Sequence, residues 1–241
     1  MSEAASAPTS PYSVGDAFNY GWNRFTKNWV PWVLGTLILG LILGAVQVVY
    51  QLIIGGPVTN LANGSIDPVT GQVTSGLGLF GAVLLPFLLY IPLFIVGAIV
   101  SANMVRAGLA ETQEKIELGK FFETERLGPV IIAAIIAGLL TAVGLLACFV
   151  GAIVVAFFVQ FFAYFVLDAD NEPWQSIKSS FSFVNQHLAT IIVLALASIL
   201  ASFVGALLCG IGLLVAYPVV AIAHAYTYKV LNGEPVQPVA T

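Results

Sequence analysis

The side chains that could carry chemistry are few and lie far apart along the chain. The 241 residues include two histidines, His187 and His224, and two cysteines, Cys148 and Cys209, each in a different segment. A protein metal site usually shows ligands at short local spacing, and these residues have none. The serine hydrolase, zinc protease, Walker and dinucleotide-binding motifs are also absent. We therefore expect a protein that is not an enzyme and that has no cofactor and no metal.

Three polar residues inside long apolar runs form the first candidate site: Gln47, Gln160 and His224. Polar groups within a membrane are costly unless they are paired, so each is expected to face other helices. If they converge, they could contact a substrate or respond to protons. The alternative is packing, in which His224 hydrogen-bonds a neighbouring helix, and its position close to Lys229 and the interface favours this alternative. No Asp or Glu is expected in mid-span, which argues against ion-coupled transport.

The two cysteines form a second candidate site. Cys148 and Cys209 are expected near the extracytoplasmic ends of two helical hairpins, where an oxidising environment would allow a disulfide. A bridge also requires Cα atoms within about 7 Å of each other. The alternative is that each cysteine is a small buried apolar side chain.

The composition places these residues in a membrane protein. The chain is 59% hydrophobic and 8% charged, whereas soluble domains are about 25% charged. The net charge is −4 and no basic cluster is present, so nucleic acid is not an expected partner. Residues 1–12 contain no basic residue and no apolar core of a signal peptide. We expect a disordered tail there and a short C-terminal tail at 232–241.

Six apolar runs are long enough to be transmembrane helices. They cover about residues 30–54, 77–104, 129–146, 149–167, 188–208 and 211–230. Pro86 and Pro92 are expected to kink the second. The expected fold is all-α: a polytopic helical membrane protein with a single domain over 13–231, built as three hairpins, each preceded by an amphipathic surface helix on the cytoplasmic side.

The basic residues predict the orientation. All eight Lys and Arg residues fall in the N-terminal segment, in the loops around 106–128 and 168–187, or at the C-terminal end. The positive-inside rule then places both termini in the cytoplasm. The expected location is a cell (inner) membrane, with membrane lipids as partners and with another membrane protein or a second copy of the chain as a further partner.

Two polar segments show helical spacing of apolar residues, one over 13–29 and one after Asn171 and Pro173. Ser13 followed by Asp16 predicts a helix cap. Each helix could lie in the headgroup layer or could pack on the bundle itself. The expected membrane-surface anchors are Phe18, Trp22, Phe25, Trp29, Trp174 and Phe181.

An internal repeat relates the hairpins. The pattern G-x-x-x-C-x-x-G occurs from Gly144 to Gly151 and again from Gly205 to Gly212, offset by 61 residues. The segment from Ala17 to Trp29 precedes the first span much as 176–188 precedes the fifth. The predicted unit is a surface helix followed by a hairpin, used three times in the same orientation. Secondary transporters with inverted repeats have a different pattern.

The segments 14–25, 171–180 and 205–212 resemble a broad group of uncharacterised bacterial membrane proteins. The group includes the YciC-like and DUF975-like proteins and the membrane domain attached to some glycerophosphodiester phosphodiesterases. The resemblance covers nearly the whole chain after Tyr12 and implies a bacterial inner membrane and a six-span fold. It implies no catalytic residue, because no phosphodiesterase domain is present.

These observations leave three hypotheses for function. The first is a non-enzymatic scaffold, a lipid-organising protein or an accessory subunit of a membrane complex. The second is a transporter or permease for a lipid or a small hydrophobic solute, with its path built from the prolines and polar residues of the spans. The third is a membrane-embedded enzyme, which the absence of paired catalytic groups disfavours.

Overall fold

The computed structural model describes residues 12–52, 65–66, 69–70, 73–74, 90–113, 116–147, 149–208 and 210–238. These residues are helical apart from turns and one short antiparallel pair, β1 (Ser65–Ile66) and β2 (Val73–Thr74). Six helical segments are long and apolar enough to cross a membrane, and one of them, Phe149–Leu167, consists of two consecutive helices. The prediction of an all-α polytopic membrane protein is confirmed.

The chain divides into two compact units. The larger unit comprises residues 1–37 and 101–241, and the smaller unit comprises residues 38–100. Helix α2 (Trp29–Tyr50) begins in the larger unit and ends in the smaller one, and α5 (Ile91–Gln113) runs the other way. In the smaller unit, the rings of Tyr50 and Tyr90 meet edge to face with their centroids 5.3 Å apart.

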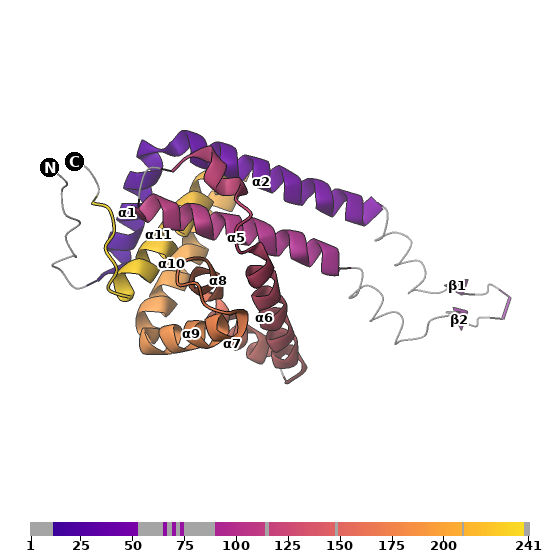
Figure 1. The fold of residues 1–241 in the computed structure, drawn as a ribbon. Helices are drawn as coiled ribbons and strands as arrows, with labels where there is room; N and C mark the ends of the chain where they lie inside the picture. Colours follow the sequence, from indigo (N-terminus) through magenta and orange to yellow (C-terminus); the bar gives the residue numbers. More distant parts are fainter. Residues whose placement is uncertain are drawn as a thin grey trace. The chain divides into compact units, whose positions relative to one another are not determined.

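The larger unit holds the remaining helices. They are α1 (Val14–Lys27), the 3-10 helix η2 (Leu118–Phe122), α6 (Leu127–Ala147), α7 (Phe149–Val159), α8 (Phe162–Leu167), α9 (Pro173–Gln186), α10 (Leu188–Leu207) and α11 (Leu213–Leu231). Helix α1 packs against α11, α6 pairs with α7, and α10 pairs with α11 (Figure 1). Helix α9 contacts α6, α7 and α8.

Helices α1 and α9 turn into the spans that follow them in the same way, and we call them the corner helices. Each has 14 residues, and a single residue, Asn28 or His187, separates it from the next span. Asn28 has φ −125° and ψ 34°, and His187 has φ −118° and ψ 30°. Four of the five residues buried in α1 have counterparts buried in α9, at the spacing found in the sequence: Ala17, Gly21, Arg24 and Phe25 correspond to Ser176, Ser180, Phe183 and Val184.

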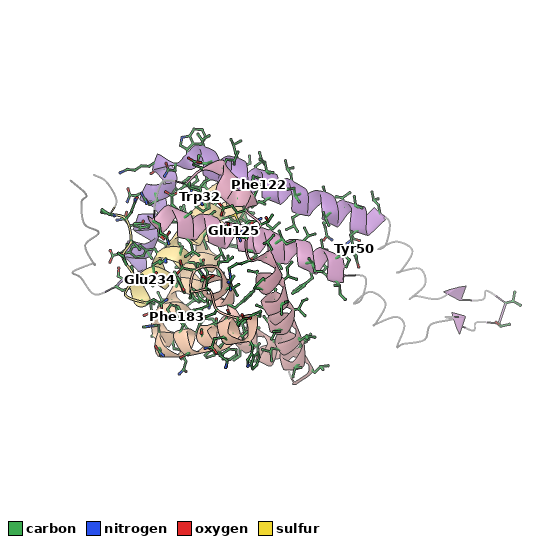
Figure 2. All side chains as sticks on the ribbon, in the orientation of Figure 1. Trp32, Tyr50, Phe122, Glu125, Phe183 and Glu234 are labelled. Atoms are coloured by element: carbon green, nitrogen blue, oxygen red, sulfur yellow. The ribbon has the colours of Figure 1, made fainter. Side chains whose placement is uncertain are left out.

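Side chains explain where the corner helices begin and what they bury. Ser13 caps α1 by accepting a 3.0 Å hydrogen bond from the Asp16 backbone N–H, as predicted. On the inner face, a Cβ at Gly21 would lie 2.6 Å from the Val219 backbone oxygen. Helix α1 therefore packs directly on the backbone of α11. The second corner helix carries Phe183, which is labelled in Figure 2. Phe183 is buried in an aromatic core, where its ring centroid lies 5.0 Å from that of Phe161.

Paired glycines explain the motif shared by the last two hairpins. A Cβ at Gly144 would lie 2.8 Å from the Gly151 backbone oxygen, and a Cβ at Gly205 would lie 3.0 Å from that of Gly212. Both hairpins thus bring their two helices into backbone contact at the motif glycines. Cys148 and Cys209 lie outside the described residues, so the disulfide stays a prediction.

The helices depart from the expected boundaries in four places. Helix α5 continues past the predicted end at 104 to Gln113, because its charged side chains are buried and paired. Pro92 is the second residue of α5, where its missing N–H breaks no helical bond, so the predicted mid-span kink at Pro92 is wrong. Pro86 lies outside the described residues.

A 3-10 helix, η2, lies before α6, where a surface α-helix was expected. The fourth span is interrupted at 160–161, between α7 and α8.

The contact at Gly21 predicts the stability of the α1–α11 interface. Gly21→Ala should lower the free energy of unfolding by about 1–3 kcal/mol, because the added methyl meets a backbone oxygen that cannot move away cheaply. The matched control is Gly40→Ala in α2, where a Cβ meets nothing within 4 Å. Thermal unfolding in a mild detergent, followed by tryptophan fluorescence, measures both. Equal melting temperatures for the two variants would contradict the packing.

Candidate functional site

A buried carboxylate, Glu111, is the centre of the most highly connected polar cluster in the larger unit. Glu111 lies in the last turn of α5 and is 0% exposed. The Asn28 side-chain amide donates a 2.7 Å hydrogen bond to Oε1, and the Trp32 indole N–H donates a 2.9 Å bond to Oε2. Both carboxylate oxygens therefore have a partner inside the protein.

Arg24 completes the cluster from α1. Its guanidinium donates to the Glu111 backbone oxygen from Nε at 3.1 Å and from Nη2 at 2.5 Å, and its Nε lies 3.6 Å from Oε1. Nη2 also donates a 3.0 Å bond to the side-chain oxygen of Gln237, whose backbone N–H donates a 2.8 Å bond to the Thr112 oxygen. We call Arg24, Asn28, Trp32, Glu111 and Gln237 the carboxylate clasp.

The local sequence explains how the clasp forms. Arg24, Asn28 and Trp32 follow one another at intervals of four residues, which places side chains on one face of a helix. The corner at Asn28 keeps this spacing across the boundary between α1 and α2, so one face of the two helices presents all three donors. One sequence signal could have predicted the clasp. It is the four-residue spacing of Arg24, Asn28 and Trp32, taken together with the acid at Glu111.

The surroundings of the clasp are neutral and apolar. Burial raises the pKa of Tyr20 to about 12, so this phenol is uncharged under the Arg24 guanidinium, which lies 5.6 Å from its ring centroid. Removing a paired charge from such a site costs more than removing a surface pair, since the remaining partner stays buried without compensation. A carboxylate with both oxygens occupied and no exposed surface holds helices together and is closed to an external substrate.

A second buried pair joins the ends of α8 and α11. The Lys229 ammonium is 2.6 Å and 2.8 Å from the two Asp168 oxygens and 2.5 Å from a Glu234 oxygen. Lys229 is 4% exposed. Asp168 and Lys229 are 61 residues apart, which is the offset between the two glycine motifs. Equivalent positions at the ends of two hairpins therefore bind each other.

Two arginines hold the loop that precedes α6. Arg106 donates to the Asn103 side chain at 2.7 Å and to the backbone oxygens of Glu123 and Glu125. Glu125, labelled in Figure 2, lies in this loop. Arg126 is 2.9 Å from a carboxylate oxygen of Asp170. These contacts use Arg106 and Arg126, two of the charged residues of this segment, to hold the loop in place.

Two of the three intramembrane polar residues predicted from the sequence, His224 and Gln160, have separate hydrogen-bond partners. His224 Nε2 is 2.9 Å from the Ser198 hydroxyl on α10, and its ring stacks on Phe161 at 5.8 Å. Gln160 donates a 2.8 Å bond to the Phe157 backbone oxygen, within its own segment. Gln47 is half-buried in the part of α2 that belongs to the smaller unit.

The break in the fourth span is closed by the second corner helix. The Ser180 hydroxyl donates a 2.8 Å bond to the Phe158 oxygen and accepts a 3.1 Å bond from the Phe161 N–H. Backbone groups freed by a helix break need such partners in a membrane. Helix α9 thus supplies part of the hydrogen bonding of the span on which it packs.

The six expected membrane anchors divide into two groups. Trp22, Trp29 and Trp174 are 52%, 57% and 54% exposed. Phe25 is buried in the protein, and Phe18 and Phe181 are half-buried and pack against apolar clusters of the larger unit. The three exposed tryptophans are available to a membrane surface. Within the described segments, no group of three or more His, Cys, Asp or Glu side chains could hold a metal ion.

Comparison with known proteins finds relatives but no activity. The chain is 31% identical over 233 residues to the uncharacterized proteins Mb2590 of Mycobacterium bovis and Rv2560 of Mycobacterium tuberculosis. Each alignment covers 93% of this chain and 70% of the relative. No protein-family model matches the chain, and no solved structure matches it.

The clasp predicts a specific cost for an isosteric change. Glu111→Gln should lower the free energy of unfolding by about 1–3 kcal/mol, because a Gln amide places an NH₂ opposite a donor, either Asn28 or Trp32, and one bond is lost. Glu117→Gln is the matched control, since Glu117 is exposed. Thermal unfolding in detergent compares them. A Glu111 variant as stable as the control would show that the clasp contributes nothing.

Proposed function

Because the chain belongs to the family of the uncharacterized mycobacterial proteins Mb2590, MT2637 and Rv2560, whose names state no activity, we propose its function from its own geometry. It is a non-enzymatic membrane scaffold that organises lipid or holds a partner in a membrane complex. The observation that carries this proposal is the complete internal pairing of Glu111 at 0% exposure. Glu111, a buried acid that could otherwise suggest a catalytic group, instead joins α5 to α1 and α2, and Arg24 extends the contact to the C-terminal segment.

Two other ionisable side chains of the larger unit, Lys229 and His224, support the same proposal. Lys229 is paired with Asp168 and Glu234, and His224 is paired with Ser198. A general acid or base must reach a substrate proton, directly or through one water. Groups that are buried against their own chain suit a rigid support better than a reaction centre.

The outer faces of the spans indicate what such a support would hold. In α10, 22% of the most apolar stretch is buried inside the structure. Its exposed residues are apolar: Leu196, Ile199, Leu200, Phe203 and Leu207. In water such a face would drive association. In a membrane it is covered by acyl chains, by a second copy or by another membrane protein, which are the partners of a scaffold.

A transporter for a lipid or a small hydrophobic solute is the second candidate. The interruption between α7 and α8 favours it, because discontinuous spans form the binding sites of many transporters. Gln160 lies at this interruption, and Phe161 stacks on His224. The pairing of each polar group with its own chain makes this candidate the weaker one.

The placement of the basic residues supports an orientation for the chain in the membrane. We place the chain in a bacterial inner membrane with both termini in the cytoplasm, since the positive-inside rule puts Arg24, Arg106 and Lys229 on that side. Green fluorescent protein fused after Thr241 should fluoresce, and alkaline phosphatase at the same position should be inactive. The control is alkaline phosphatase inserted in the segment 55–76, which should be active. The opposite pattern would reverse the orientation.

Crosslinking followed by affinity purification from the native membrane tests the scaffold. Wild type should retain one defined protein partner or a fixed oligomer in mild detergent, and Glu111→Gln should lose it in step with its loss of stability. A clean wild-type monomer would count against the scaffold. In proteoliposomes, fluorescent-lipid movement that is abolished by Gln160→Leu and His224→Leu, but unchanged by Ser182→Ala on the exposed face of α9, would establish the transporter instead.

A further inference from the structure

The basic side chains of the chain fall into two groups. Five make ion pairs within the larger unit: Arg24, Arg106, Lys120, Arg126 and Lys229. Lys115 lies outside the described residues. Lys27 and Lys178 are exposed, and neither makes an ion pair with any residue that the structure describes. The two unpaired lysines both lie on corner helices.

Each unpaired lysine has an exposed tryptophan near it on the same helix or corner. Lys178 follows Trp174 by four residues, one turn along the exposed face of α9. Lys27 ends α1, between Trp22 and Trp29, and both rings are more than half exposed. Opposite these faces, the corner helices are packed on α11 and on α6, α7 and α8. The lysines and tryptophans therefore lie on the exposed faces of the corners, where Trp22 also contacts the Phe25 ring of its own helix.

No acidic side chain of the same helix competes for these ammonium groups. Asp16 in the first turn of α1 is the last acid before Lys27, and Glu172 at the start of α9 is the last before Lys178. Glu111 contacts the corner at Asn28, but both of its oxygens are already occupied. Both ammonium groups are therefore open to an anion from outside the described structure.

We propose that the two corner helices are binding sites for anionic phospholipid, one at each corner, with the lipid phosphate on Lys27 or Lys178. Tryptophan prefers the headgroup level of a bilayer, and lysine beside it is attracted to anionic lipid. A one-residue corner carries each helix directly into an apolar span, which keeps it at the membrane surface. The inference rests on the proposed membrane location and deepens the lipid-organising part of the proposed function.

A lipid-dependent melting experiment on the full chain tests the sites. In a neutral detergent, phosphatidylglycerol should raise the melting temperature of the wild type more than phosphatidylcholine does. Lys27→Gln and Lys178→Gln should each lose part of this extra rise, and the double variant should lose most of it, with the melting temperature in phosphatidylcholine unchanged. Lys120→Gln is the matched control, because it removes the same charge from a lysine 2.9 Å from Glu123.

Several results would overturn the proposal. They are a wild type without preference for phosphatidylglycerol, a double variant that keeps the full rise, and a Lys120→Gln variant that loses as much as the other two. Inorganic phosphate alone should give no rise, and a rise equal to that of phosphatidylglycerol would identify a free-anion site. If the double variant does not fold, the melting temperatures of the two single variants test the proposal. Lipid preference of the purified chain needs no partner and no transport, so its failure is distinct from failure of the scaffold.

Quenching by brominated lipid provides a second readout that does not depend on stability. Brominated phosphatidylglycerol should quench the part of the fluorescence that Trp174→Phe removes more strongly than brominated phosphatidylcholine does, and Lys178→Gln should remove the difference. Trp32 stays in every variant, because it is 0% exposed and is bonded to Glu111. Equal quenching of Trp174 by both lipids would contradict a phosphate site at Lys178.

Discussion

The larger unit depends on the requirement that a charge removed from water be paired. Glu111 is fully buried, and it is held by Asn28, Trp32 and Arg24 from two helices that are distant in sequence from α5. An unpaired carboxylate at this position would be strongly unfavourable, so the three elements are held in one arrangement. Spans that pack through small residues and apolar side chains gain little specificity from hydrophobicity alone, because lipid is equally apolar. Polar pairing supplies that specificity here.

Buried polar groups are also paired at three other places where helices end. Lys229 joins the ends of α8 and α11, Arg106 holds the loop before α6, and Ser180 satisfies the break between α7 and α8. Close backbone contacts at Gly21, Gly144 and Gly205 then set the distance between helices. Consequently the polar groups of the larger unit act mainly as connectors. Among the described residues, the exposed tryptophans and the unpaired Lys27 and Lys178 remain available for contact with the surroundings. This distribution fits a membrane scaffold that contacts lipid at its surface.

Several parts of this architecture have features in common. The corner helices share their length, their one-residue corner and their buried register, although they pack on different neighbours. Before α6, the 3-10 helix η2 takes this place, and the charged residues there bind Arg106. The last two hairpins share a glycine contact, and the ends of their final helices bind each other through Asp168 and Lys229.

Sequence alone determined the class of the protein, the number of spans and the cap at Ser13, because these depend on composition and on local periodicity. It also supplied the spacing of Arg24, Asn28 and Trp32, but it could not show that these residues share a partner. The sequence predicts a loop around 106–128, which includes Glu111, and a charge in a polar loop is usually solvated. Tertiary structure decided that α5 continues through it and buries it. Whether an aromatic residue faces lipid or protein was decided in the same way: Phe25 and Trp22 have similar sequence surroundings, and packing on the rest of the chain buries the first and exposes the second.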